Sequence, residues 1–283
     1  MRCDRIRWRN WDAVRCLTED CELVVGVSAG PRILSLRVGE GPNLLYVDTT
    51  GFRVGEWNLY GGHRFTVGPE GAASYLPDNA PCFVEVTDGR LRVAAPGGVD
   101  GLRRELELYV AEDGVGFDVF HRLHHEGELP WTGVLWGITC MPNTGRILAP
   151  ATREGLRYWP GTTSEHWFLE SGHLAFQRGH SRGKVGWYGN PAWLAIRQSQ
   201  AILVIHSPEV APEPRCADGG CNVEVFVCGD YLELETLSGE TRLTRGEVAT
   251  HRQRWRILRP DQDLCDCRSI ALQAGCTPLP TDL

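Results

Sequence analysis

The chain has 283 residues, with 29 basic and 36 acidic side chains, which gives a formal net charge of −7 and a pI near 5.7. This acidic balance argues against a nucleic-acid partner, which would favour a basic face. No apolar run is long enough to span a membrane, and the N-terminus MRCDRIRWRN lacks the apolar segment of a signal peptide. We therefore expect a soluble, cytoplasmic protein with neither a membrane nor a nucleic-acid partner.

Eleven cysteines test that expectation. Their odd number and the missing export signal argue against a full disulfide framework. The stretches CADGGC and CDC lack the CxxC…CxxC spacing of a structural zinc site. Most of these cysteines should therefore be small buried hydrophobes, with a few local disulfides left open, and we expect neither a metal nor another cofactor.

Period-two alternation of apolar and polar residues dominates the chain and predicts β-strands. In chain order, the expected strands cover residues 22–27, 32–38, 43–47, 82–87, 91–95, 102–110, 116–123, 133–141, 193–196, 202–206, 223–227, 231–236 and 252–258. Residues 149–182 are typical of loops with short strands. No stretch longer than about a dozen residues has a convincing helical period.

Many short strands without a linker-like break in composition predict a single all-β sandwich domain. We expect this domain to cover residues 21–259, after an N-terminal extension of residues 1–20 and before a C-terminal tail of residues 260–283.

A dense group of polar residues lies in the stretch WNLYGGHRFTVGPEGAASYLPDN, residues 57–79. It contains His63, Arg64, Glu70 and Asp78. The Gly-Gly pair before His63 permits backbone conformations that residues with a Cβ resist, and the two carboxylates lie in Pro-containing turns. The stretch is either a site or an ordinary turn region with solvated charges.

The motifs GPRILSL…GPNLLY, GGHRFTVGPE, YLPDNAP, KVGW, DGGCNVEVFVCGDYLELETLSG and TRGE…HRQRW occur in this order. This series resembles a bacterial family related to galactose mutarotase (aldose 1-epimerase) and covers most of the chain. The resemblance implies an all-β, single-domain β-supersandwich whose concave face binds a small-molecule carbohydrate or related polyol. The same fold occurs in domains of glycoside hydrolases and polysaccharide lyases, so fold alone does not establish activity. We expect a monomer or a homodimer.

Mutarotase chemistry needs a general base for the anomeric hydroxyl and a general acid for the ring oxygen. The resemblance implies that Glu235, in LELETLSGETRLTRGE, is the base. Glu233 should share its strand face, and Glu224 is a third candidate on the neighbouring strand. The mid-chain histidine that mutarotases use as the acid has no counterpart in WTGVLWGIT. His63 is therefore the expected acid, and Arg64 is the expected substrate clamp.

The remaining candidates for substrate binding are weaker. Arg178 and Lys184 could bind an anionic sugar or be solvated loop charges, and His206 could face the cleft or simply end a strand. Trp187 and Trp136 could stack on a pyranose ring, although a place in the core is the stronger expectation for Trp136. The full set of expected substrate-binding residues is Arg64, Glu70, Asp78, Arg178, Lys184, Trp187, His206, Glu224 and Glu233. In this set Glu70 and Asp78 are expected mainly to fix Arg64 and the turns.

The leading hypothesis is a mutarotase- or epimerase-like enzyme that applies acid–base chemistry to a bound sugar. A rival hypothesis is a carbohydrate-binding or sensing domain without catalysis. A third is a lyase or a biosynthetic tailoring enzyme built on the same fold.

Overall fold

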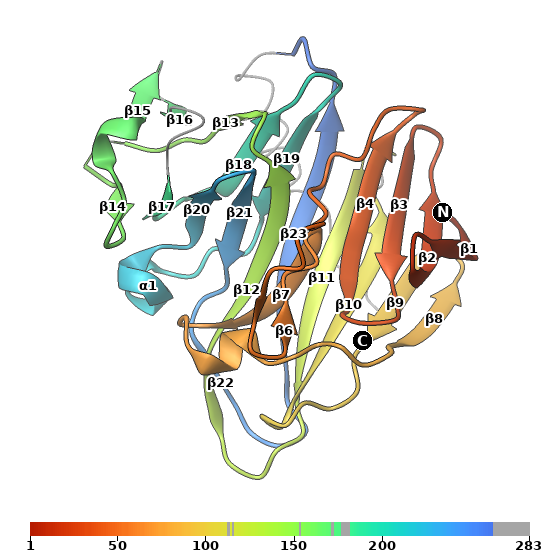
Figure 1. Ribbon diagram of the computed structural model, residues 1–283. Helices are drawn as coiled ribbons and strands as arrows, with labels where there is room; N and C mark the ends of the chain where they lie inside the picture. Colours follow the sequence, from red (N-terminus) through yellow and green to blue (C-terminus); the bar gives the residue numbers. More distant parts are fainter. Residues whose placement is uncertain (112–113, 115, 153, 171–172, 177–181, 263–283) are drawn as a thin grey trace.

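The computed structural model describes residues 1–111, 114, 116–152, 154–170, 173–176 and 182–262, and in this part of the chain two antiparallel sheets pack against each other (Figure 1). The larger sheet has eleven strands, in the order β1 (Arg2–Trp8), β2 (Trp11–Leu17), β3 (Cys21–Gly26), β4 (Arg32–Val38), β7 (His63–Gly68), β12 (Trp131–Pro142), β21 (Tyr231–Leu237), β20 (Val223–Cys228), β17 (Arg182–Trp187) and β14 (Arg157–Tyr158), while β22 (Thr241–Leu243) also pairs with β12.

The second sheet has eight strands, in the order β13 (Arg146–Leu148), β18 (Ala192–Arg197), β19 (Ile202–Ser207), β23 (Val248–Leu258), β11 (Gly116–His125), β10 (Leu102–Val110), β9 (Arg90–Ala94) and β8 (Phe83–Thr87). Two small hairpins are β5 (Arg53–Val54) with β6 (Trp57–Asn58), and β15 (Trp167–Glu170) with β16 (His173–Phe176). The described helical segments are short, namely 3-10 turns at Ala72–Tyr75, Ser164–His166 and Glu213–Arg215, and α1 (Ala217–Gly220). This all-β architecture confirms the expected fold class.

The strand pattern read from the sequence differs from the structure in several places, and the strands β7 and β17 of the larger sheet were not among those expected. Residues 43–47 form no strand; only an isolated bridge joins Val47 to Gly61. The expected N-terminal extension is part of the larger sheet, because β1 and β2 form a hairpin that pairs with β3. The expected C-terminal tail lies outside the described residues from position 263 onward.

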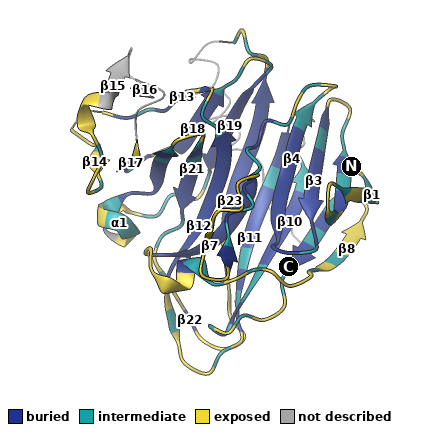
Figure 2. Cartoon of the chain, viewed as in Figure 1, coloured by how far each residue is buried: buried dark blue, intermediate teal, exposed yellow. Residues whose placement is uncertain are grey.

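The core lies between the two sheets and consists of apolar side chains. Figure 2 shows that the central strands of both sheets are largely buried. Successive side chains of a strand point to opposite faces, so every second residue faces this core. On the larger sheet these include Phe65, Leu135 and Leu234, and on the second sheet they include Val119 and Trp255. The intervening residues of the larger sheet face outward, where their side chains can form a site.

A chain of polar side chains crosses this core. His63 Nδ1 is 2.9 Å from Thr139 Oγ1, and His63 Nε2 is 2.8 Å from His121 Nε2. His121 Nδ1 lies 2.8 Å from the carbonyl oxygen of His251, and His251 Nε2 lies 2.7 Å from Thr236 Oγ1. Burial lowers the pKa of His121 to about 4 and that of His251 to about 3, and it lowers the pKa of His63 well below its ordinary value. All three rings are therefore neutral at neutral pH.

Two features are absent from the described residues. No helix there has the length and apolar character needed to cross a membrane. No group of three or more His, Cys, Asp or Glu side chains in the same part of the chain is arranged to hold a metal ion.

Candidate functional site

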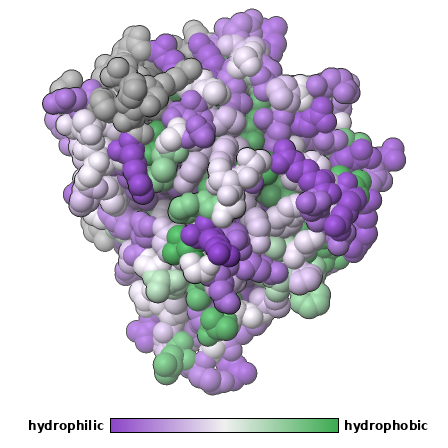
Figure 3. Space-filling view, viewed as in Figure 1, coloured by the Kyte–Doolittle hydropathy of each residue, from purple (hydrophilic) through white to green (hydrophobic). Residues whose placement is uncertain are grey.

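A cavity of about 560 Å³ lies on the outer face of the larger sheet, over the strands β7, β12, β21, β20 and β17. On the front of the molecule, Figure 3 shows apolar groups near the centre, within a largely hydrophilic surface. Side chains from the five strands form the floor of the cavity: Arg64, Trp136, Ile138, Arg182, Lys184, Phe226, Cys228, Tyr231, Glu233 and Glu235. The walls come from residues between Tyr46 and Leu59 and from Glu70 and Tyr75.

Strand register brings Arg64 and Glu235 onto one row of the floor. Ile138 of β12 pairs with Arg64 on one side and with Glu235 on the other, and Glu235 in turn pairs with Glu224 of β20. Because neighbouring strands are about 4.8 Å apart, Arg64 and Glu235 start from backbone positions roughly 10 Å apart. That spacing is suited to a ligand the size of a sugar ring.

Glu235 has a fully buried side chain at the floor of the cavity. Its Oε2 atom accepts hydrogen bonds from the Trp136 indole N–H at 2.8 Å and from Lys184 Nζ at 2.9 Å. Its Oε1 atom is also buried and accepts no hydrogen bond within the described part of the chain. Two donors therefore fix one oxygen of this carboxylate, and the other oxygen accepts no hydrogen bond from the described residues.

Lys184 links Glu235 to a second buried carboxylate. Its Nζ atom lies 2.6 Å from Glu224 Oε2 and 4.4 Å from the centre of the Trp136 ring. Burial alone would lower the pKa of Lys184, but the two carboxylates outweigh it and raise that pKa, so the amine stays charged. Burial raises the pKa of Glu224 well above its usual range, and the Glu235 carboxylate adds to the shift while Lys184 opposes it. One ammonium thus lies between two buried glutamates and forms an ion pair with each.

Glu233 projects into the same cavity two residues before Glu235, with a partly buried side chain. The Cys140 thiol donates a hydrogen bond to it, with Sγ 3.5 Å from Glu233 Oε1. Burial, together with the Glu235 carboxylate, raises the pKa of Glu233 to about 7, although the Arg64 guanidinium opposes the shift. Glu233 can therefore both hold and release a proton near neutral pH.

Arg64 forms the opposite side of the floor. Its guanidinium lies over the Trp57 ring, 4.8 Å from the ring centre, and donates to the Ser74 carbonyl oxygen at 3.3 Å. No carboxylate in the described residues forms an ion pair with it. The expected partner Glu70 instead accepts a hydrogen bond from the Tyr75 hydroxyl. The planar donor group of Arg64 is therefore available for a ligand.

Three expected site residues lie elsewhere, and their assignments are corrected here. His63 is fully buried between the sheets and does not line the cavity, because it precedes Arg64 on the same strand and so faces the opposite side. Trp187 belongs to the core between the sheets, since it is an odd number of positions from Lys184 on β17. His206 lies on β19 of the second sheet, where burial lowers its pKa to about 4.

Two further expected residues have different positions. Asp78 does not line the cavity; it forms an ion pair with Arg32 at 2.8 Å and so fixes the turn before β4 and not Arg64. Arg178 lies outside the described residues. Of the other expected residues, Arg64, Glu70, Lys184, Glu233 and Glu235 line the cavity, and Glu224 lies beneath it in contact with Lys184.

Aromatic residues complete the cavity, and sequence reasoning missed most of them. Tyr46 and Tyr231 stack on each other with ring centres 5.1 Å apart, and Trp57 meets Tyr75 edge to face at 5.3 Å. Tyr231 could have been found from the sequence, because it shares the parity of Glu233 on one strand. Trp136 also lines the floor, with almost no exposed surface.

No protein-family model matches this sequence, and no curated protein sequence does either. Solved structures do match. A candidate aldose 1-epimerase from Klebsiella pneumoniae superposes with a TM-score of 0.66 at 11% identity, over 96% of this chain and 87% of that one. A candidate aldose 1-epimerase from Escherichia coli K12 gives 0.55 at 14% identity, over 88% and 100% of the two chains.

A galactose mutarotase-like protein from Lactobacillus casei superposes with a TM-score of 0.58 at 8% identity, over 87% of this chain and 99% of that one. At such low identity the likeness concerns the fold alone. The chain therefore has the galactose mutarotase-like β-supersandwich fold, in agreement with the resemblance of its sequence motifs.

Proposed function

We propose that the protein binds a sugar in the cavity over β7, β12 and β21 and interconverts its anomers by acid–base chemistry. The observation that carries this proposal is the unequal pair of carboxylates on β21. Glu235 is held as an acceptor by two donors, whereas Glu233 has a pKa of about 7. Two carboxylates in one site whose environments differ in this way suit separate base and acid roles.

In the proposed reaction, Glu235 Oε1 removes the proton from the anomeric hydroxyl, and the electrons of that O–H bond form the C1 carbonyl. The bond between C1 and the ring oxygen breaks, and the ring oxygen takes the proton held by Glu233. Rotation about the C1–C2 bond of the open aldehyde presents the other face of the carbonyl. Ring closure by the reverse proton transfers then yields the other anomer, with both carboxyl groups restored.

The geometry of β21 supports this division of roles. Side chains two positions apart on a strand lie on the same face and about 7 Å apart, so the two carboxyl groups can flank the anomeric centre. Arg64, across the floor, offers donors to ring hydroxyls, and the aromatic walls offer apolar faces for the C–H surface of a pyranose. In this proposal Glu233 takes the acid role that the sequence had suggested for His63.

Anomer-exchange NMR on a panel of free and phosphorylated aldoses tests the proposal. For at least one sugar, we expect the exchange rate measured from the cross-peaks to be higher with the protein than without it. Calorimetry on the same panel measures binding separately. Binding without acceleration would replace the enzyme by the rival carbohydrate-binding or sensing domain, and neither effect for any sugar would overturn both ideas. An unsaturated product absorbing in the ultraviolet would instead indicate a lyase.

A matched pair of variants ties the activity to the cavity. Glu233→Gln removes the proposed acid and should slow exchange about 10²-fold or more. Glu240→Gln changes an exposed glutamate outside the cavity and should leave the rate unchanged. Equal rates in the two variants would remove Glu233 from the mechanism.

A further inference from the structure

A pair of cysteines faces each other across the N-terminal hairpin. Strands β1 and β2 are joined by the two-residue turn Arg9–Asn10, so Trp8 and Trp11 form the first hydrogen-bonded pair. Hydrogen-bonded and non-hydrogen-bonded pairs alternate along an antiparallel ladder. Cys3 and Cys16 are paired five positions further on and are therefore a non-hydrogen-bonded pair. In such pairs the Cα atoms are about 4.5 Å apart, which is within the range of disulfides.

The two sulfur atoms are already in contact. Cys3 Sγ lies 2.7 Å from Cys16 Sγ, so only a small movement separates the two atoms from the length of an S–S bond, about 2.05 Å. Cys16 is fully buried in the core, whereas Cys3 is partly exposed at the edge of the sheet. The exposed sulfur can therefore meet a small oxidant, and the buried sulfur is placed to resolve the product.

We propose that Cys3 and Cys16 form a disulfide when the protein meets a low-molecular-weight disulfide such as oxidised glutathione. The Cys3 thiolate, having released its proton to water, attacks one sulfur of the oxidant and expels a glutathione thiolate. Cys16 then gives its proton to the first glutathione thiolate and attacks the Cys3 sulfur of the mixed disulfide, which expels the second glutathione thiolate; water returns the proton released by Cys3 to that thiolate. The protein loses two hydrogen atoms, and one oxidised glutathione becomes two reduced glutathiones.

The environment of the pair favours this order of events. The hydrogen bond between the two thiols lowers the pKa of Cys3 and, together with burial, raises the pKa of Cys16. The attacking group is the thiolate, so Cys3 reacts first. The bond would tie the outermost strand of the larger sheet to its neighbour, whose Val14 packs in the core. The cavity lies over other strands of the same sheet, so anomer exchange should not depend on this bond.

The experiment uses the full chain with Cys265, Cys267 and Cys276 changed to Ser, because these three lie outside the described residues. The protein is equilibrated in buffers of increasing oxidised-to-reduced glutathione ratio, alkylated and mapped by peptide mass. We expect a peptide linking Cys3 to Cys16 to appear before any linkage of Cys82. The linked form should unfold roughly 5–10 °C higher than the reduced form, and dithiothreitol should reverse this shift.

Three variants keep the outcome unambiguous. Cys3→Ser and Cys16→Ser should each abolish the redox-dependent shift, and Cys82→Ser, which changes another partly exposed cysteine, should retain it. Both single variants are tested because a serine hydroxyl at the buried position 16 could prevent folding, whereas one at the partly exposed position 3 should not. Full alkylation of both thiols at the most oxidising ratio would overturn the proposal, as would a shift that persists in Cys3→Ser.

Discussion

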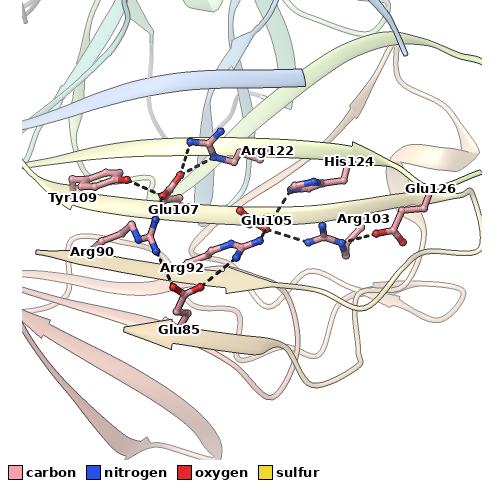
Figure 4. A network of polar contacts seen from close by, with 10 residues as sticks. All are labelled: Glu85, Arg90, Arg92, Arg103, Glu105, Glu107, Tyr109, Arg122, His124 and Glu126. Carbon is pink, nitrogen blue, oxygen red and sulfur yellow. Dashed lines mark hydrogen bonds and ion pairs between the residues drawn. The ribbon is translucent and has the colours of Figure 1, made fainter. Parts of the chain in front are cut away.

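In the described part of the chain, buried and partly buried glutamates cluster in two regions, and their surroundings differ. On the outer face of β9, β10 and β11, the Glu105 carboxylate has three nitrogen neighbours (Figure 4). Its Oε2 atom lies 2.8 Å from Arg92 Nη2, 3.1 Å from Arg103 Nη1 and 3.3 Å from His124 Nε2. In the cavity, a single ammonium serves Glu224 and Glu235, and Glu233 has only a thiol as hydrogen-bond donor within the described residues.

The pKa shifts follow this difference. Burial alone would raise the pKa of Glu105, but the hydrogen bonds and charge of Arg92 and its neighbours lower it. Burial raises the pKa of Glu233, and too little positive charge is present to reverse the shift. A carboxylate surrounded by cations stays ionised. A carboxylate with too few cations around it can take up and release a proton near neutral pH. Such a perturbed group in a cavity is typical of a functional site.

The largest expected effect is on activity at Glu235. Glu235→Gln keeps the shape of the side chain but removes the base, so anomer exchange should fall about 10³-fold, while circular dichroism stays native-like. NMR exchange rates at several sugar concentrations separate this loss from weaker binding. Retained turnover would remove Glu235 as the base and would weaken the contrast between the two regions.

Lys184→Met should have the largest effect on stability. Without the ammonium, Glu224 and Glu235 are left buried and facing each other across β20 and β21, which should cost about 3–5 kcal/mol of unfolding free energy. Urea denaturation measures this loss. The double variant with Glu224→Gln should recover part of it, since one of the two carboxylates is gone. If the stability loss of the double variant equals the sum of the losses of Lys184→Met and Glu224→Gln measured separately, Glu224 and Glu235 do not share the charge of Lys184.

The pH dependence of stability should have opposite signs in the two regions. The pKa of Glu233 rises from about 4.5 in the unfolded chain to about 7 on folding, so its ionisation opposes folding as pH rises between these values. Relative to Glu233→Gln, the wild type should therefore lose roughly 3 kcal/mol of stability between pH 4.5 and 7. Urea midpoints of both proteins at a series of pH values give this difference. A constant difference across that window would show that the Glu233 pKa is unperturbed.

The smallest expected effect is at Glu105. Its pKa is lowered on folding, so its contribution is present above the unfolded value near 4.5 and is lost as pH falls through the folded value. Glu105→Gln should cost about 1–3 kcal/mol at neutral pH, because it removes a buried, hydrogen-bonded charge. The rate of anomer exchange should not change. A loss of activity here would break the distinction between a structural and a functional carboxylate.

The sequence allowed most of the strands and one side of the site to be predicted, because both depend on local alternation. Glu233 and Glu235 share a face of β21, as their spacing indicates, and both line the cavity. The same alternation argues against His63 beside Arg64, since adjacent strand residues face opposite sides. The ion pairs of Lys184 could not be predicted, because they depend on the register of β17 against β20, which brings together residues about forty positions apart in the chain.

The histidine chain between the sheets has a direction. A carbonyl oxygen only accepts, so His121 must carry its proton on Nδ1, and its bare Nε2 must accept from His63 Nε2–H. His63 Nδ1 then has to accept from the Thr139 hydroxyl. In the observed stacking of the two sheets, each donor along this line has an acceptor. A sandwich that slipped by one pair would bury mismatched groups, so this small network favours one alignment of the two sheets across a mainly apolar interface.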